Sequence, residues 1–165
     1  MSEFLFRRPA VLAGLSTAIL LAACAAPSQK PPPPVEKPQP TCQAPAQGDT
    51  LVGNWLSVRK EKGVAGELRT LFTLHPDGTM AYTEQLKRGS KPSQGLSETG
   101  CWTHSGQTLV LQTLQSNGVP IDTKDPIYTN RYVVASQSGK SLTMRRSDGT
   151  SIKAKQMSPG YRLPF

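Results

Sequence analysis

The sequence predicts an all-β domain: an eight-stranded antiparallel up-and-down meander that closes fully or partly into a barrel. From about residue 51 onward, short runs rich in β-branched, aromatic and leucine residues alternate with glycine-containing turns, which is typical of strands. No stretch of this region has the periodicity of an amphipathic helix. A meander of eight strands with one apolar face can close on itself and so leave no exposed sheet edge.

The runs place eight strands, whose ends carry an error of a few residues, at 51–58, 67–75, 79–87, 96–104, 107–115, 127–136, 140–146 and 150–156. Three turns, at 76–78, 137–139 and 147–149, suit a three-residue hairpin loop that ends in a left-handed glycine. These loops bring apolar residues face to face in the pairs Leu74 with Met80, Phe72 with Tyr82, Val134 with Leu142, Tyr132 with Met144, Met144 with Ile152, and Leu142 with Ala154.

The last three strands therefore share one apolar face, made of Tyr132, Val134, Leu142, Met144, Ile152 and Ala154. One turn remains ambiguous. At Ser105-Gly106, a two-residue loop pairs Trp102 with Leu109, and a three-residue loop pairs it with Thr108.

Residues 1–23 read as a signal peptide, with Arg7 and Arg8 before the apolar run 10–22. The segment Leu21-Ala22-Ala23-Cys24 resembles the lipobox of bacterial lipoproteins. That resemblance implies cleavage before Cys24, lipidation of its thiol, and a membrane anchor. Ala25 stands where an aspartate would retain an enteric-type lipoprotein in the inner membrane, so we expect the outer membrane, with the barrel facing the periplasm. The alternative is an ordinary secretory signal with a chance cysteine.

Residues 24–48 are expected to be the lipidated cysteine and a proline-rich tether, followed by the barrel domain at 49–165. Proline-rich segments favour the extended polyproline II conformation and carry too few apolar residues to fold. If the lipid takes Cys24, the two remaining cysteines, Cys42 and Cys101, can pair in an oxidising periplasm. Two unpaired thiols are the alternative.

The opening Gly53-Asn54-Trp55 looks like the Gly-x-Trp start of lipocalins. Together with Phe72 to Gly78 and Gly100 to Trp102, it makes the domain similar to small bacterial lipocalin-like lipoproteins. The resemblance implies an up-and-down barrel that binds apolar ligands or acts as an envelope module.

Meander connectivity places the long loops 59–66, 88–95 and 116–126 at the end of the barrel away from the tether. This end carries a basic rim, for which we single out Lys60, Lys62, Arg88 and Lys91. Loops on a rigid scaffold are the usual place for function.

The predicted register places Asn130 opposite Arg146 on the apolar face near the loops. A buried arginine needs partners, so this pair either caps the core or meets an anionic group on a ligand. Our candidate ligand-binding residues are Arg146, Asn130, Tyr132, Tyr82 and Trp55. The tryptophans, Trp55 and Trp102, can also simply plug the barrel.

The chain shows no zinc-type spacing, no nucleophile with a base beside it and no phosphate loop, so we expect no metal, no cofactor and no enzymatic activity. The formal net charge of +8 would suit nucleic acid, but an exported protein rarely meets it. Anionic envelope components are more plausible partners.

The leading hypothesis is therefore a lipid-anchored envelope protein whose small barrel binds an apolar or anionic ligand or an envelope partner. A hollow barrel would favour an apolar ligand, and a filled one would favour protein contact. The alternatives are an inhibitor of a periplasmic hydrolase, such as a protease or lysozyme, and an assembly or pilot factor of an envelope machine.

Overall fold

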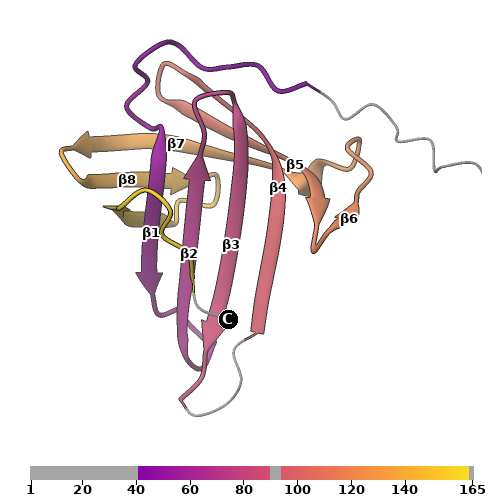
Figure 1. Ribbon diagram of the computed structural model, residues 1–165. Coiled ribbons are helices and arrows are strands. Elements are labelled where there is room, and N and C mark those ends of the chain that lie inside the picture. Colours follow the sequence, from indigo (N-terminus) through magenta and orange to yellow (C-terminus); the bar gives the residue numbers. More distant parts are fainter. Residues whose placement is uncertain (1–40, 90–93, 164–165) are drawn as a thin grey trace, which may run out of the picture. The chain divides into compact units, whose positions relative to one another are not determined.

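The computed structural model describes residues 41–89 and 94–163, which form a closed barrel of eight antiparallel strands with one further strand outside the ring (Figure 1). The ring closes because β4 pairs with both β3 and β5. The elements are β1 (Gly53–Arg59), β2 (Glu67–Leu74), β3 (Thr79–Lys87), β4 (Gln94–Ser105), β5 (Thr108–Ser116), β6 (Val119–Pro120), the 3-10 turn η1 (Pro126–Tyr128), β7 (Thr129–Ser138), β8 (Ser141–Arg146) and β9 (Ser151–Met157).

The eight-stranded meander is thus confirmed, and of the two predicted alternatives the barrel is fully closed. Only β6, the strand outside the ring, and the short turn η1 were not predicted. The expected signal peptide, Cys24 and the tether up to residue 40 lie outside the described residues, as does Lys91.

Two of the predicted hairpins have the expected register. Leu74 lies opposite Met80 across the turn 76–78, and Met144 lies opposite Ile152 across the turn 147–149. Both turns contain an aspartate that organises the loop. Its carboxylate accepts the backbone N–H two residues later, at 2.9 Å from Thr79 and at 2.8 Å from Thr150.

The registers predicted for the other two hairpins are wrong. In each, glycine takes the first position of a two-residue loop, so the loops are Gly106-Gln107 and Gly139-Lys140. These glycines have φ values of +58° and +52°, which suit the first position of a type II′ turn. Neither loop has an aspartate before its glycine. Trp102 consequently lies opposite Leu111 instead of Leu109 or Thr108.

The β7–β8 hairpin also contains a β-bulge at Ala135, between Val134 and Ser136. The two-residue loop moves the pairing by three positions and the bulge takes back one, so Val134 lies opposite Met144 instead of Leu142, and Tyr132 lies opposite Arg146 instead of Met144. The shift amounts to two residues. Because side chains alternate with a period of two, the same residues still face the interior.

The interior is one apolar cluster that includes both tryptophans. Its buried members are Leu51, Trp55, Phe72, Leu74, Met80, Tyr82, Trp102, Leu109, Leu111, Tyr132, Leu142, Met144, Ile152 and Ala154, and Val134 packs against them half-buried. The predicted apolar face of the last three strands is therefore confirmed.

The connections sort to two ends of the barrel. The turn end carries the tight turns 75–78, 106–107 and 139–140, and there the chain enters β1 and leaves β9. The loop end carries the segments 60–66, 88–89 and 117–128, with the tight turn 147–150. The described part of the expected tether, residues 41–48, thus joins the barrel at the turn end, as the connectivity predicted.

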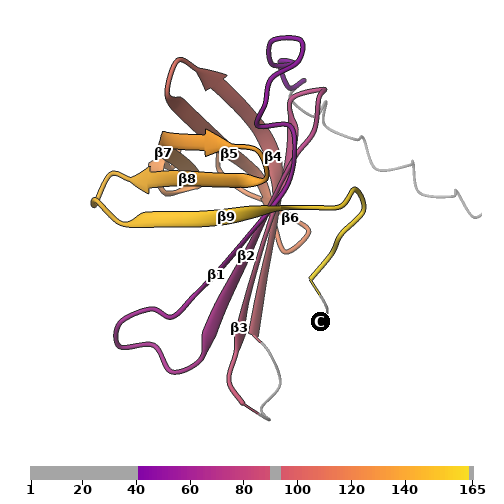
Figure 2. The ribbon, with the colours of Figure 1, turned by 90° about the vertical axis from the view of Figure 1, so that its left-hand side faces the viewer.

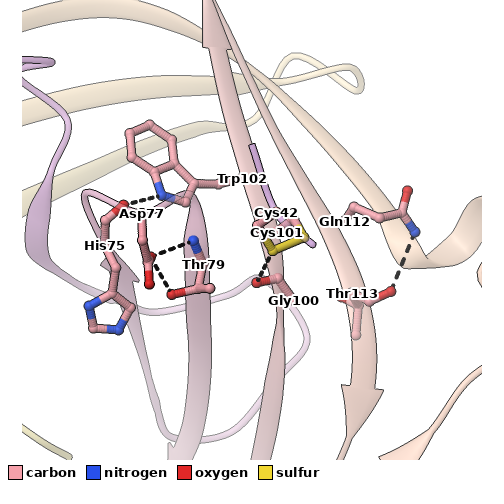
Figure 3. Close-up of a disulfide and its surroundings, with 9 residues drawn as sticks. All are labelled: Cys42, His75, Asp77, Thr79, Gly100, Cys101, Trp102, Gln112 and Thr113. Atoms are coloured by element: carbon pink, nitrogen blue, oxygen red, sulfur yellow. Dashed lines mark hydrogen bonds between the residues drawn. A yellow bond between two sulfur atoms is a disulfide. The ribbon is translucent and has the colours of Figure 1, made fainter. Parts of the chain in front are cut away.

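Several cross-links hold the turn end together (Figure 3). Cys42 and Cys101 form the expected disulfide, with their Cα atoms 5.3 Å apart. The indole N–H of Trp102 donates to the carbonyl of His75 at 2.8 Å. The segment after Cys42 lies so close to the turn 76–78 that a Cβ at Gly78 would collide with the carbonyl of Gln43.

At the loop end the barrel wall opens between β1 and β9. These strands pair over only three positions, from Asn54 with Met157 to Leu56 with Lys155. Beyond them the two strands diverge, as Figure 2 shows from the side. Beyond Leu56, β1 is therefore paired with β2 alone.

Candidate functional site

The middle of the barrel is filled by aromatic side chains. Trp55 and Trp102 have no exposed surface, Phe72 and Tyr132 are also buried, and Tyr82 keeps 9% of its surface exposed. The Phe72 ring meets those of Tyr82 and Tyr132 edge to face, with centroids 5.4 Å and 5.9 Å apart. Surfaces hidden this completely from solvent leave no room for an apolar ligand against them.

Above this layer, toward the loop end, the inward positions become polar. The loop-end cluster consists of Arg59 on β1, Thr70 on β2, Tyr82 and Glu84 on β3, Tyr132 on β7 and Arg146 on β8. Strand alternation explains the change, because Thr70 is the next inward position after Phe72, and Glu84 is the next after Tyr82.

Glu84 is the hub of the loop-end cluster. One of its carboxylate oxygens, Oε2, accepts from the Tyr82 hydroxyl at 2.6 Å and from the Thr70 hydroxyl at 3.3 Å. Arg59 donates to the Thr70 hydroxyl at 3.0 Å and lies 3.4 Å from Glu61 and 4.0 Å from Glu84. The Nε of Arg59 is buried and has no hydrogen-bond partner among the described residues.

Burial and the neighbouring Glu84 carboxylate raise the pKa of Tyr82 well above its usual range. Burial also raises the pKa of Tyr132, although the Arg146 guanidinium opposes this by its charge and by a hydrogen bond. Both hydroxyls therefore stay protonated at physiological pH, and each can donate a hydrogen bond.

Arg146 is half-buried at the mouth of the barrel. Its pKa is raised because the attraction of the nearby tyrosine hydroxyls and carboxylates outweighs the effect of burial, so it remains charged. Among the described residues, no carboxylate lies within ion-pair distance of its guanidinium. A guanidinium has five N–H donors, so this group keeps donors for a further acceptor.

The structure brings together three of the five candidate ligand-binding residues, namely Tyr82, Tyr132 and Arg146. The expected pairing of Asn130 with Arg146 is wrong, because the two-residue loop Gly139-Lys140 and the bulge at Ala135 together shift the register by two positions; Asn130 lies opposite Leu111 and is exposed. Trp55 lies deeper, where its indole N–H donates to the Leu51 carbonyl at 2.8 Å.

Sequence reasoning missed Arg59, Thr70 and Glu84 as members of the site. Their signal was present in the register of the first hairpin, which set Phe72 opposite Tyr82 and so placed Thr70 opposite Glu84.

The basic rim is exposed where the structure describes it. Lys60 and Lys62 lie in the loop between β1 and β2, and Arg88 follows β3; all three are exposed, and none forms an ion pair within the described residues. Glu61, between the two lysines, is half-buried and contacts Arg59. The rim therefore presents positive charge around the mouth.

Within residues 41–89 and 94–163, no group of three or more histidine, cysteine or acidic side chains is arranged to hold a metal ion. No helix among the same residues is long and apolar enough to cross a membrane. The chain matches no model of a known protein family and no curated protein.

Proposed function

We propose that this chain is a lipid-anchored protein of the outer membrane that uses the loop end of its barrel to bind an anionic envelope component. Three features support the proposal. The lipobox-like segment ends at Cys24, the disulfide at Cys42 ties the end of the tether to the turn end, and positive charge gathers at the opposite end.

The observation that carries the proposal is Arg146. It lies at the mouth beside two protonated tyrosine hydroxyls, it is charged, and it has no carboxylate partner among the described residues. A carboxylate or phosphate can accept two parallel hydrogen bonds from one guanidinium, which makes such groups its best acceptors. The filled interior argues against an apolar ligand.

Carboxylates and phosphates come from different parts of the envelope, so the test has two arms. The chain from residue 25 onward is sedimented with purified peptidoglycan sacculi, which carry carboxylates, and with phosphatidylglycerol vesicles, which carry phosphates. We expect the wild type to bind in one of the two assays, and we expect Arg146→Met to bind less than the wild type in that assay. Equal binding by wild type and Arg146→Met in both arms, or binding in neither, would overturn the proposed role of Arg146.

The anchor has a separate test. Cys24→Ser should abolish labelling by radioactive palmitate and leave the precursor uncleaved by the lipoprotein peptidase. Unchanged processing and membrane partition in this variant would exclude the lipoprotein.

A second candidate function is contact with an envelope protein, either as an inhibitor of a periplasmic protease or lysozyme or as an assembly or pilot factor. Apolar side chains exposed in the loops favour it, because Val64, Val119 and Ile127 keep 38%, 63% and 69% of their surface exposed. If this function is correct, Ile127→Asp should weaken inhibition or co-purification of the partner, and Arg146→Met should have little effect.

A further inference from the structure

A second hollow lies outside the barrel wall, on the outward face of β1, β2 and β3. We call it the outer groove. Its floor includes Leu71, Thr73, Ala81 and Thr83, and its outer wall is the segment 158–163 that follows β9. In Figure 2 this segment lies on the opposite side of the β1–β4 sheet from β7 and β8. The groove has a volume of about 970 Å³, at the upper end of the range of roughly 300–1,000 Å³ for small-molecule sites.

The wall of the outer groove is fixed to the barrel. The side-chain amide of Asn54 donates to the carbonyl of Ser158 at 3.0 Å, and the backbone N–H of Tyr161 closes a turn onto the same carbonyl at 3.2 Å. Further along, Leu163 is 4% exposed, like Leu71 on the floor. A wall tied to β1 at Ser158 and buried at Leu163 makes the groove a formed feature of the surface.

The lining combines apolar side chains, among them Val52, Leu71, Leu74, Met157 and Leu163, with polar and basic ones. It offers hydroxyl groups, side-chain amides, one tyrosine ring and basic side chains, from Thr73, Thr83, Ser97, Ser158, Asn54, Gln156, Tyr161, Lys140 and Arg162. No aspartate or glutamate lines the groove. Lys140 and Arg162 are exposed and form no ion pair within the described residues, so their charges are available to a ligand.

We propose that the outer groove binds an acidic oligosaccharide. Hydroxyl and amide side chains can exchange hydrogen bonds with sugar hydroxyls, an aromatic ring can lie against the apolar face of a sugar ring, and the two cations suit a carboxylate. An extended peptide fits less well. The backbones of β2 and β3 are paired on both sides, so they offer no free edge to an added strand.

This proposal goes beyond the proposed function, because it concerns another face of the barrel. The two sites share no residue, so variants can separate them. Arg146→Met changes the loop end and leaves the outer groove intact, whereas Arg162→Ala does the reverse.

Calorimetric titration tests the proposal with two tetrasaccharides. One alternates N-acetylglucosamine with N-acetylmuramic acid, and the other contains N-acetylglucosamine alone, so the pair differs only in the lactyl ether groups, each of which carries a carboxylate. We expect the wild-type chain to bind the acidic tetrasaccharide about tenfold more tightly than the neutral one, as the loss of one charge-assisted hydrogen bond would give.

Arg162→Ala and Lys140→Ala should each remove most of this preference. Both side chains are exposed, so the fold should survive, which circular dichroism can check. Lys153→Ala is the matched control, since Lys153 is exposed on β9 but does not line the groove. It should bind as wild type does. In Arg146→Met, which removes the contribution of the loop end, the preference for the acidic tetrasaccharide should persist. Failure to bind the acidic tetrasaccharide, equal affinity for both sugars, or an unchanged preference in Arg162→Ala and Lys140→Ala would overturn the proposal.

Discussion

The two ends of this barrel are built on opposite principles. At the turn end, the disulfide, the hydrogen bond from the Trp102 indole to the His75 carbonyl and a 2.8 Å contact between His104 and Asp49 connect segments far apart in the chain. At the loop end, the wall opens between β1 and β9, and charged side chains replace apolar ones on the inward face. Stability is concentrated at one end, which leaves the other free to carry polar groups that a ligand can use.

The largest loss of stability should follow from removing a buried side chain at the turn end. Trp102→Ala removes a side chain with no exposed surface and leaves the His75 carbonyl without its indole donor. We expect a loss of about 3–5 kcal/mol in the free energy of unfolding, measured by urea denaturation. Arg146→Met, the matched change at the loop end, should cost less than about 1 kcal/mol. Equal losses of unfolding free energy in Trp102→Ala and Arg146→Met would contradict the proposed difference in stability between the two ends.

The disulfide should come next. It joins cysteines separated by 59 positions, for which the chain-entropy model gives about 4 kcal/mol, and measured values are often smaller. Cys42→Ala/Cys101→Ala should therefore unfold at lower urea concentration than the wild type, by about 2–4 kcal/mol. Adding reductant should lower the stability of the wild type but not of the variant. A free-thiol count of two for Cys42 and Cys101 in periplasm-derived protein would contradict the bond itself.

The sequence was sufficient for the order of the strands and for both hairpins in which an aspartate precedes the turn glycine. Asp77 and Asp148 fix their loops through their own carboxylates, so the information is local. The sequence was insufficient to predict the registers of the hairpins at Gly106 and Gly139. Which position of a loop a glycine takes, and whether a bulge such as that at Ala135 follows, depends on the pairing of the whole strands.

The candidate site shows the same division. The alternation of side chains along the strands correctly placed Tyr82, Tyr132 and Arg146 on the inward face. Predicting which residues lie opposite one another also requires the strand register, which was wrong for β7, so Asn130 was placed opposite Arg146. The outer groove was not predicted at all. It exists because the chain after β9 folds back over the outward face of β1 and β2, and no periodic pattern in the sequence marks such a return.

A smaller effect is expected within the loop-end cluster. Tyr82→Phe removes the 2.6 Å hydrogen bond to Glu84 and keeps the buried ring. Glu84 retains the Thr70 hydroxyl and is partly exposed to water, so we expect a loss of about 1–2 kcal/mol in the free energy of unfolding. Tyr128→Phe, outside the cluster, is the control. A neutral result for Tyr82→Phe would mean that the cluster contributes nothing to stability.

The smallest effect concerns pH. Burial raises the pKa of Glu98 above its usual value of 4.5, helped by Glu84 and opposed by a hydrogen bond from Thr113. The folded state therefore holds this proton more tightly than the unfolded state. The resulting stabilisation is fully present below pH 4.5 and is lost as pH rises through the folded pKa.

Glu98→Gln keeps an acceptor for Thr113 and removes the titration. Its free energy of unfolding should exceed that of the wild type at pH 7, and the advantage should shrink toward pH 4. Because Glu98 is only partly buried, the difference should be small. Urea denaturation at both pH values measures it, and an advantage that grows as pH falls would contradict the assignment.

Charge reversal at matched positions tests the central claim, that the loop end is the binding end, most directly. Lys60→Glu/Lys62→Glu reverses two exposed charges at the loop end, and Lys153→Glu/Lys155→Glu reverses two exposed charges on the outer face of β9. Sedimentation with sacculi and with phosphatidylglycerol vesicles is measured for both variants over a range of salt concentrations. The first variant should lose most of its binding, and the binding that remains should depend less on salt. The second variant should keep both its binding and its salt dependence, because exposed charges act over only about 10 Å at 0.1 M salt. Equal loss in both variants, or salt-insensitive binding by the wild type, would contradict the assignment of binding to the loop end.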